Sequence, residues 1–182
     1  MDRLQFYKSL YDQEFEKLKE FQNSLNIPLA IIVVIATGIY SILTTFHYDN
    51  FNCNSIIFLV LCSISILFLI WCMYYFLRIF AFSLKEDSKY RYIEFTDNLE
   101  NNYKDLRQYY MAMSPPNPQQ ALIDYENSLL ENLALTCGAN ARFNIRKAAL
   151  LQRGKELLSL SLVFIIGAFI PYFINFFYHI KG

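Results

Sequence analysis

The chain has 182 residues with no net formal charge, and 55% of its residues are hydrophobic. This length allows one domain, or a small domain plus a membrane anchor. The absence of net positive charge argues against broad nucleic-acid binding, which requires a basic surface. The apolar residues are concentrated in three blocks, and this clustering predicts an all-α membrane protein with three transmembrane helices.

Residues 1–26 have the pattern of a cytoplasmic amphipathic helix. Four apolar residues recur at intervals of seven, namely Leu4, Tyr11, Leu18 and Leu25. Tyr7 and Phe21 occupy intervening positions, whereas Glu14 interrupts this second series. The seam predicts a coiled-coil-like contact, either with other helices of the same chain or with a second subunit.

Two uncharged apolar blocks follow, at 27–46 and 56–77. Each has the roughly 20 residues that a helix needs to cross a hydrocarbon core about 30 Å thick. Backbone groups in lipid must bond within their own segment, so both blocks are expected to be helical. The linker between them is short, and we therefore expect a transmembrane hairpin over 27–83.

Hydroxyl side chains form a stripe in the first block. Thr37, Ser41 and Thr44 are separated by four and three residues, and Thr45 lies four beyond Ser41, so all four share one helix face. Small and hydroxyl residues favour close helix packing in membranes. The same face would suit the wall of a pore assembled from several subunits, and both interpretations stay open.

Residues 84–156 are expected to form a cytoplasmic helical hairpin. The first arm, over 86–113, has apolar residues at helical spacing, namely Tyr92, Phe95, Leu99, Tyr103, Leu106, Tyr110 and Met113. Three prolines within residues 114–119 end this helix. A returning helix should begin near Gln119, and its apolar face is expected at Leu130, Leu133, Cys137, Ala141, Ile145 and Ala148.

A polar and basic stretch precedes the last apolar block. Asn140 and Asn144 lie about one turn apart, so their amides are expected to clamp neighbouring helices of the chain, or to contact an oligomer partner or a ligand. Arg146 and Lys147 follow them. These cations are expected to set the topology of the last span and to attract anionic headgroups, and together the four residues are a candidate cytoplasmic interface.

Residues 157–182 complete the predicted fold with a third transmembrane helix and a short outer tail. Its apolar block covers 157–178. The linker at 47–55 has no Lys or Arg, whereas residues 78–155 have eleven. The positive-inside rule then predicts a protein of the inner (cytoplasmic) membrane with a cytoplasmic N-terminus and an outer C-terminus.

Several kinds of chemistry are not indicated. The two histidines, His47 and His179, both fall at the predicted outer boundary. This placement excludes histidine-based acid–base catalysis in the cytoplasmic part. No phosphate-binding loop, CxxC pair or other metal motif occurs, and no charged residue lies within a span. We therefore expect no catalytic, cofactor-binding or metal-binding residues, no enzyme activity and no ion-coupled transport.

The order of these elements, together with the segment LIDYENSLLENLALTCGANARFNIRKAALLQRG at 122–154, resembles a known group of proteins. The chain looks like small bacterial membrane proteins of phage-defence loci, in particular the membrane accessory proteins of RNA-targeting type VI CRISPR loci. It is more loosely similar to the SLATT effector domains, which have two spans. The resemblance implies a change in membrane permeability as an antiviral output.

Two functions are expected from the sequence. The first is an oligomeric membrane effector that forms a pore or leak as part of a bacterial antiviral defence system. The second is a non-conducting anchor or scaffold that regulates a cytoplasmic partner nuclease. The expected partners are membrane lipid, further copies of the chain and a cytoplasmic defence protein, without direct nucleic-acid binding.

Overall fold

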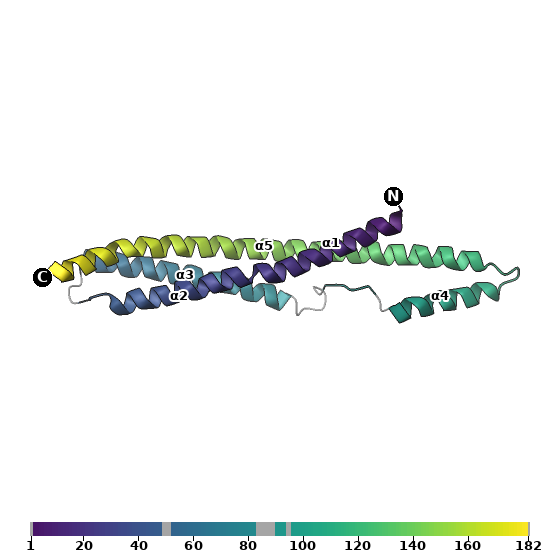
Figure 1. Cartoon of the computed structure of the whole chain (residues 1–182), viewed down its shortest axis with the longest axis horizontal. Helices are drawn as coiled ribbons and strands as arrows, with labels where there is room; N and C mark the ends of the chain where they lie inside the picture. Colours follow the sequence, from purple (N-terminus) through teal and green to yellow (C-terminus); the bar gives the residue numbers. More distant parts are fainter. Residues whose placement is uncertain (1, 49–51, 83–89, 94–95, 182) are drawn as a thin grey trace. The chain divides into compact units, whose positions relative to one another are not determined.

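The computed structural model describes residues 2–48, 52–82, 90–93 and 96–181. These residues contain five helices and no strand: α1 (Arg3–Ser24), α2 (Asn26–Thr45), α3 (Cys53–Phe82), α4 (Thr96–Met111) and α5 (Pro118–Lys181) (Figure 1). The chain divides into two compact units. We call residues 20–85 and 146–182 the span unit, and residues 1–19 and 86–145 the polar unit.

The three predicted spans are confirmed as helices that are long and apolar enough to cross a membrane. The apolar blocks lie within α2, α3 and the later part of α5, so the chain is a membrane protein. Between α1 and α2, Leu25 keeps a right-handed helical backbone. The helix assignment breaks there because Pro28 has no N–H to offer the Ser24 carbonyl one turn earlier.

The core of the span unit is formed by one apolar seam from each helix. The buried residues of these seams are Ile32, Ile35, Ile39 and Ile42 on α2 with Phe46 just after it, Phe58, Cys62, Leu69, Cys72, Phe76 and Ile79 on α3, and Leu151, Leu158, Ile165 and Ala168 on α5. With Ser65, Gly154 and Ser161, these positions alternate by three and four residues. A mean spacing of 3.5 is the heptad of a left-handed coiled coil.

Small side chains allow α3 and α5 to approach closely in this unit. The hydroxyls of Ser65 and Ser161 lie 2.8 Å apart, and both serines are fully buried. Gly154 faces the ring of Phe76, and the Cys72 thiol donates to the Gly154 carbonyl at 3.2 Å. In lipid, such packing and interhelical hydrogen bonds drive helix association, because the hydrocarbon is as apolar as leucine.

The polar unit contains the first part of α1, the non-helical segment 90–93, α4 and the first part of α5. The α4 helix runs beside α5 (Figure 1), and the rings of Tyr103 and Tyr125 lie 5.4 Å apart. Further along, the Tyr110 hydroxyl donates to the Asp124 carboxylate. These contacts join residues far apart in sequence and show that the two helices are antiparallel.

The predicted start of the helix over 86–113 is wrong. Residues 90–93 are not helical and α4 begins at Thr96, so Tyr92 does not belong to its face. The helix ends at Met111, before Met113. Phe95 and residues 86–89 lie outside the described residues.

The predicted apolar face of the returning helix is also partly wrong. Ile145 is 68% exposed and Ala148 is exposed, whereas Leu133 and Cys137 are buried as expected. The α5 helix continues through Gly138. The buried side instead includes Asn140 and Asn144, whose amides bond partners outside α5.

Candidate functional site

The hydroxyl stripe of α2 lies on the outside of the span unit. Thr37, Ser41, Thr44 and Thr45 are all exposed in one copy of the chain. The threonine hydroxyls donate to carbonyls of their own helix, as in the 2.9 Å bond from Thr37 to Val33. A hydroxyl that is bonded in this way tolerates lipid and still has lone pairs for water or for a neighbouring helix.

The end of this stripe is joined to the third span. The Thr45 hydroxyl lies 3.0 Å from the Tyr172 hydroxyl on α5. Nearby, the Asn54 side chain donates to the Pro171 carbonyl at 2.8 Å, and Asn175 donates to the His47 carbonyl at 3.1 Å. The stripe residues therefore differ in their contacts. Thr45 makes a hydrogen bond to another helix, whereas within the described part of the chain the structure records no such bond for the hydroxyls of the other three residues.

An apolar groove lies between α2 and α3 on the span unit. It encloses about 650 Å³, and Ile39, Leu69 and Met73 are among its lining residues. The lining is almost entirely apolar. In a membrane, this groove suits acyl chains or apolar side chains and does not suit a polar ligand.

Asn140 holds a non-helical backbone segment in the polar unit. The side chain is fully buried, and its amide bonds both backbone groups of Arg91. The Arg91 N–H donates to the Asn140 oxygen at 2.8 Å, and the Asn140 nitrogen donates to the Arg91 carbonyl at 2.9 Å. These two bonds satisfy both backbone polar groups of Arg91, which lies outside any helix.

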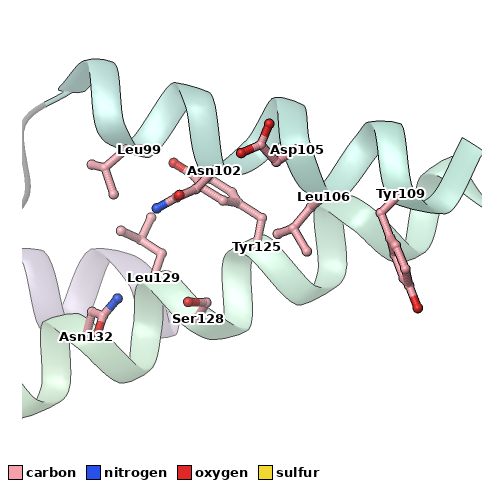
Figure 2. A pocket seen from close by; sticks show the side chains of 9 residues that line it. All are labelled: Leu99, Asn102, Asp105, Leu106, Tyr109, Tyr125, Ser128, Leu129 and Asn132. Carbon is pink, nitrogen blue, oxygen red and sulfur yellow. The ribbon is translucent and has the colours of Figure 1, made fainter.

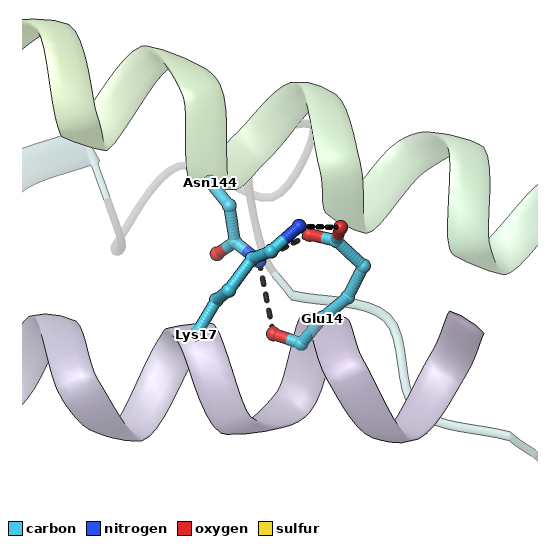
Figure 3. A network of polar contacts seen from close by, with 3 residues as sticks. All are labelled: Glu14, Lys17 and Asn144. Carbon is cyan, nitrogen blue, oxygen red and sulfur yellow. Dashed lines mark hydrogen bonds and ion pairs between the residues drawn. The ribbon is translucent and has the colours of Figure 1, made fainter. Parts of the chain in front are cut away.

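Asn144 joins α5 to α1 through a buried carboxylate. Its amide nitrogen donates to the Glu14 carbonyl at 2.9 Å and to the Glu14 carboxylate at 2.8 Å (Figure 3). The Lys17 ammonium pairs with the same carboxylate at 2.6 Å. Glu14 and Asn144 are 8% and 4% exposed. The charge that interrupts the apolar series of α1 is thus accommodated by a polar partner on α5.

Tyr90 lies among aromatic rings beside this network. Its ring centroid is 6.1 Å from that of Phe15 and 6.3 Å from that of Phe143. Among the described residues, its buried hydroxyl has no hydrogen-bond partner. Burial raises the pKa of Tyr90 well above its ordinary value of 10.0, and the nearby Tyr11 and Glu14 raise it further.

The four residues of the candidate cytoplasmic interface do not form one accessible surface. Asn140, Asn144 and Lys147 are buried, and only Arg146 is exposed. Both asparagine amides make contacts within the chain, as described above. In one copy of the chain, therefore, Arg146 alone of these four residues is accessible to a partner.

A cleft between α4 and α5 was not predicted from the sequence. It encloses about 380 Å³ and is lined by Leu99, Asn102, Asp105, Leu106, Tyr109, Tyr125, Ser128, Leu129 and Asn132. Tyr125 reaches from α5 toward Asn102 on α4 (Figure 2). The signal in the sequence is weak, because these polar residues lie on the borders of the apolar faces, where solvated side chains are usual.

Other site chemistry is limited. In the described part of the chain, no group of three or more His, Cys, Asp or Glu side chains could hold a metal ion. The four cysteines are not joined in disulfides, and only Cys53 is exposed. Comparison of the chain with protein-family models, with curated proteins and with solved structures finds no match.

Proposed function

We propose that this protein is an oligomeric membrane effector that alters membrane permeability through a path lined by α2. The observation that carries the proposal is the outward position of Thr37, Ser41 and Thr44 on a membrane-spanning helix. An isolated three-helix anchor gains most from its hydroxyls when they lie in its own core. An outward stripe is instead available to neighbouring copies or to water between them.

The packing of the span unit favours a path between copies over one through a single copy. Its centre holds large side chains, and Phe58 and Phe76 are 0% and 1% exposed. Interiors packed in this way leave few voids larger than a water molecule. Several copies arranged around an axis would instead bring their α2 stripes together, and a pore of this kind can open and close by wetting.

A second candidate function is a non-conducting anchor that regulates a cytoplasmic partner. The polar unit supports it, because that unit has a solvent-accessible cleft and a fold fixed by its own buried amides. The threonine hydroxyls of α2 bond to carbonyls of their own helix, so they also tolerate lipid. This candidate predicts that no ion flux occurs under any condition.

The basic residues of 78–155 support an orientation with a cytoplasmic N-terminus and an outer C-terminus, in an inner membrane. On this topology the polar unit would meet cytoplasmic partners. A role in antiviral defence rests on the resemblance of segment 122–154 alone.

The test is ion flux through liposomes that contain the purified protein, with its oligomeric mass measured in detergent. We expect a multimer that releases a trapped dye or ions, and loss of that release in Ser41→Leu. The matched control is Ser63→Leu, which makes the same change at an exposed position on α3. A monomer without flux, or flux that persists unchanged in Ser41→Leu, would overturn the proposed path.

A further inference from the structure

We propose that the cleft between α4 and α5 is a binding site for an alkylammonium group. The proposal concerns the polar unit only and does not depend on whether the span unit conducts. The volume of about 380 Å³ is within the range of small-molecule sites, roughly 300–1,000 Å³. A second cavity of about 120 Å³ shares Leu99, Leu129 and Asn132 with it, so the concave surface is elongated along the two helices.

The charge of the lining selects for a cation. Asp105 is the one charged residue among the nine that line the cleft. The surrounding segment 96–137 also has a net negative charge. Its acidic side chains are Asp97, Glu100, Asp105, Asp124, Glu126 and Glu131, and its basic ones are Lys104 and Arg107. Lys104 is paired with Glu100 at 3.7 Å. A field of this sign attracts cations and repels phosphates and carboxylates.

The polar atoms of the lining match the needs of an ammonium group. An ammonium has three N–H donors and no acceptor, so it requires several oxygen partners. The cleft offers the Asp105 carboxylate, the Ser128 hydroxyl and the amide oxygens of Asn102 and Asn132. In the described structure, no hydrogen bond or ion pair within the chain engages these four side chains. The Tyr125 ring adds an aromatic face, to which cations are attracted.

The apolar part of the lining explains why we specify an alkyl stem. Leu99, Leu106 and Leu129 line the cleft together with the polar groups. Methylene groups gain free energy when such side chains cover them, while the charged end stays at the polar rim. An inorganic cation would leave these leucines without a contact. The combination therefore fits a chain of methylenes that ends in an ammonium.

Two sources could supply this chemistry, namely a free polyamine or a lysine side chain on a partner protein. Calorimetric titration of the full chain in nanodiscs of uncharged lipid distinguishes them, with spermidine and a short lysine-containing peptide as separate probes. Succinate serves as the anionic control. Uncharged lipid is required because anionic headgroups would themselves bind both cationic probes.

The central variant is Asp105→Asn, which keeps the shape of the side chain and removes its charge. We expect saturable binding of at least one probe to the wild type, weakened roughly 3- to 10-fold by Asp105→Asn. The matched control is Glu126→Gln, which removes an exposed acid of the same region that does not line the cleft. It should change the affinity much less than Asp105→Asn.

A third variant, Ser128→Trp, fills the cleft without changing its charge and should also weaken binding. The tighter of the two cationic probes identifies the source. The proposal is overturned if neither probe binds, if succinate binds as well as spermidine, or if Asp105→Asn and Glu126→Gln weaken binding equally. Circular dichroism of each variant shows whether its helices are intact, and all three positions are exposed.

Discussion

The span unit and the polar unit use the same helical spacing but differ in the polar side chains that they bury beside their apolar ones. In the span unit, the buried seam positions are mostly Ile, Leu and Phe, and its buried polar residues include the small Ser65 and Ser161. In the polar unit, buried positions include Glu14, Asn140 and Asn144. Each of these three side chains makes a hydrogen bond to a segment far away in sequence.

This difference shows which force holds each unit together. The hydrophobic effect favours the burial of apolar side chains in water but not in lipid. The association of the helices of the span unit therefore depends on close packing and on hydrogen bonds between helices. In the polar unit, water favours the burial of leucines and aromatic rings, but this hydrophobic effect does not determine which segments pack against each other. Its buried amides and carboxylate define which segments meet, much as a polar residue in a coiled-coil core fixes register.

The largest effect is expected from removal of the amide that binds Glu14. Asn144→Ala should lower the free energy of unfolding of the polar unit by about 2–4 kcal/mol, because the buried carboxylate loses a donor. Hydrogen exchange of the α1 and α5 amides in the full chain would measure it. The exposed Asn127→Ala on α5 is the matched control and should cost less than about 0.5 kcal/mol.

The double variant Glu14→Leu with Asn144→Leu sharpens the same comparison. Replacing both partners by apolar side chains gives the polar unit a core like that of the span unit. We expect its stability to return to within about 1 kcal/mol of the wild type, because no buried charge is left without a partner. If the double variant is as unstable as Asn144→Ala, the unpaired Glu14 carboxylate does not cause the loss of stability in Asn144→Ala.

A smaller loss is expected when the close packing of the span unit is disturbed. A Cβ at position 154 would lie 2.6 Å from the Phe76 ring, so Gly154→Ala should destabilise the unit by about 1–3 kcal/mol. Nothing lies within 4 Å of a Cβ built at Gly38, and Gly38→Ala should be neutral or slightly stabilising. Unfolding of both variants in detergent compares them, and equal effects would contradict tight packing at Gly154.

The smallest effect is expected at the buried hydroxyl of Tyr90. Its pKa is raised above 10.0 in the folded chain, so the unfolded chain loses this proton first as pH rises. The contribution of Tyr90 to the free energy of unfolding of the polar unit should therefore be constant below about pH 9 and should fall above pH 10. Tyr90→Phe should remove that part of the fall and change the stability at neutral pH by about 1 kcal/mol or less. Denaturation at pH 8 and at pH 10.5 gives the measurement, and an unchanged alkaline loss in the variant would exclude Tyr90 as its source.

The spans could be predicted because lipid imposes a simple rule on sequence. A helix that crosses the hydrocarbon core must be apolar over about 20 residues, and the blocks at 27–46, 56–77 and 157–178 each satisfy this locally. The seven-residue spacing in residues 1–26, with its interruption at Glu14, can also be recognised locally, and the coiled-coil-like contact that it indicates stays a prediction. None of these predictions needed knowledge of which residues meet in space.

The polar unit was harder to predict because its structure depends on distant partners. Nothing in the sequence of residues 86–95 indicates that Asn140 bonds the backbone of Arg91, which lies in the non-helical segment 90–93. Ile145 was expected inside because it is apolar, yet Asn144 is buried instead. Asn144 is buried where its amide meets Glu14 on α1. The spacing of residues along α5 gives no information about this partner.

Ser65 and Asn54 bond partners on α5 that are synthesised long after them. Their partners, Ser161 and Pro171, are synthesised 96 and 117 residues later. At the roughly 5–20 residues per second of translation, the α2–α3 hairpin waits for seconds in the bilayer before these partners exist. During that interval, the Ser65 hydroxyl and the Asn54 amide lack the α5 carbonyls that accept their hydrogen bonds in the folded chain. Until α5 is inserted, both groups are available to water, to their own helix or to other helices.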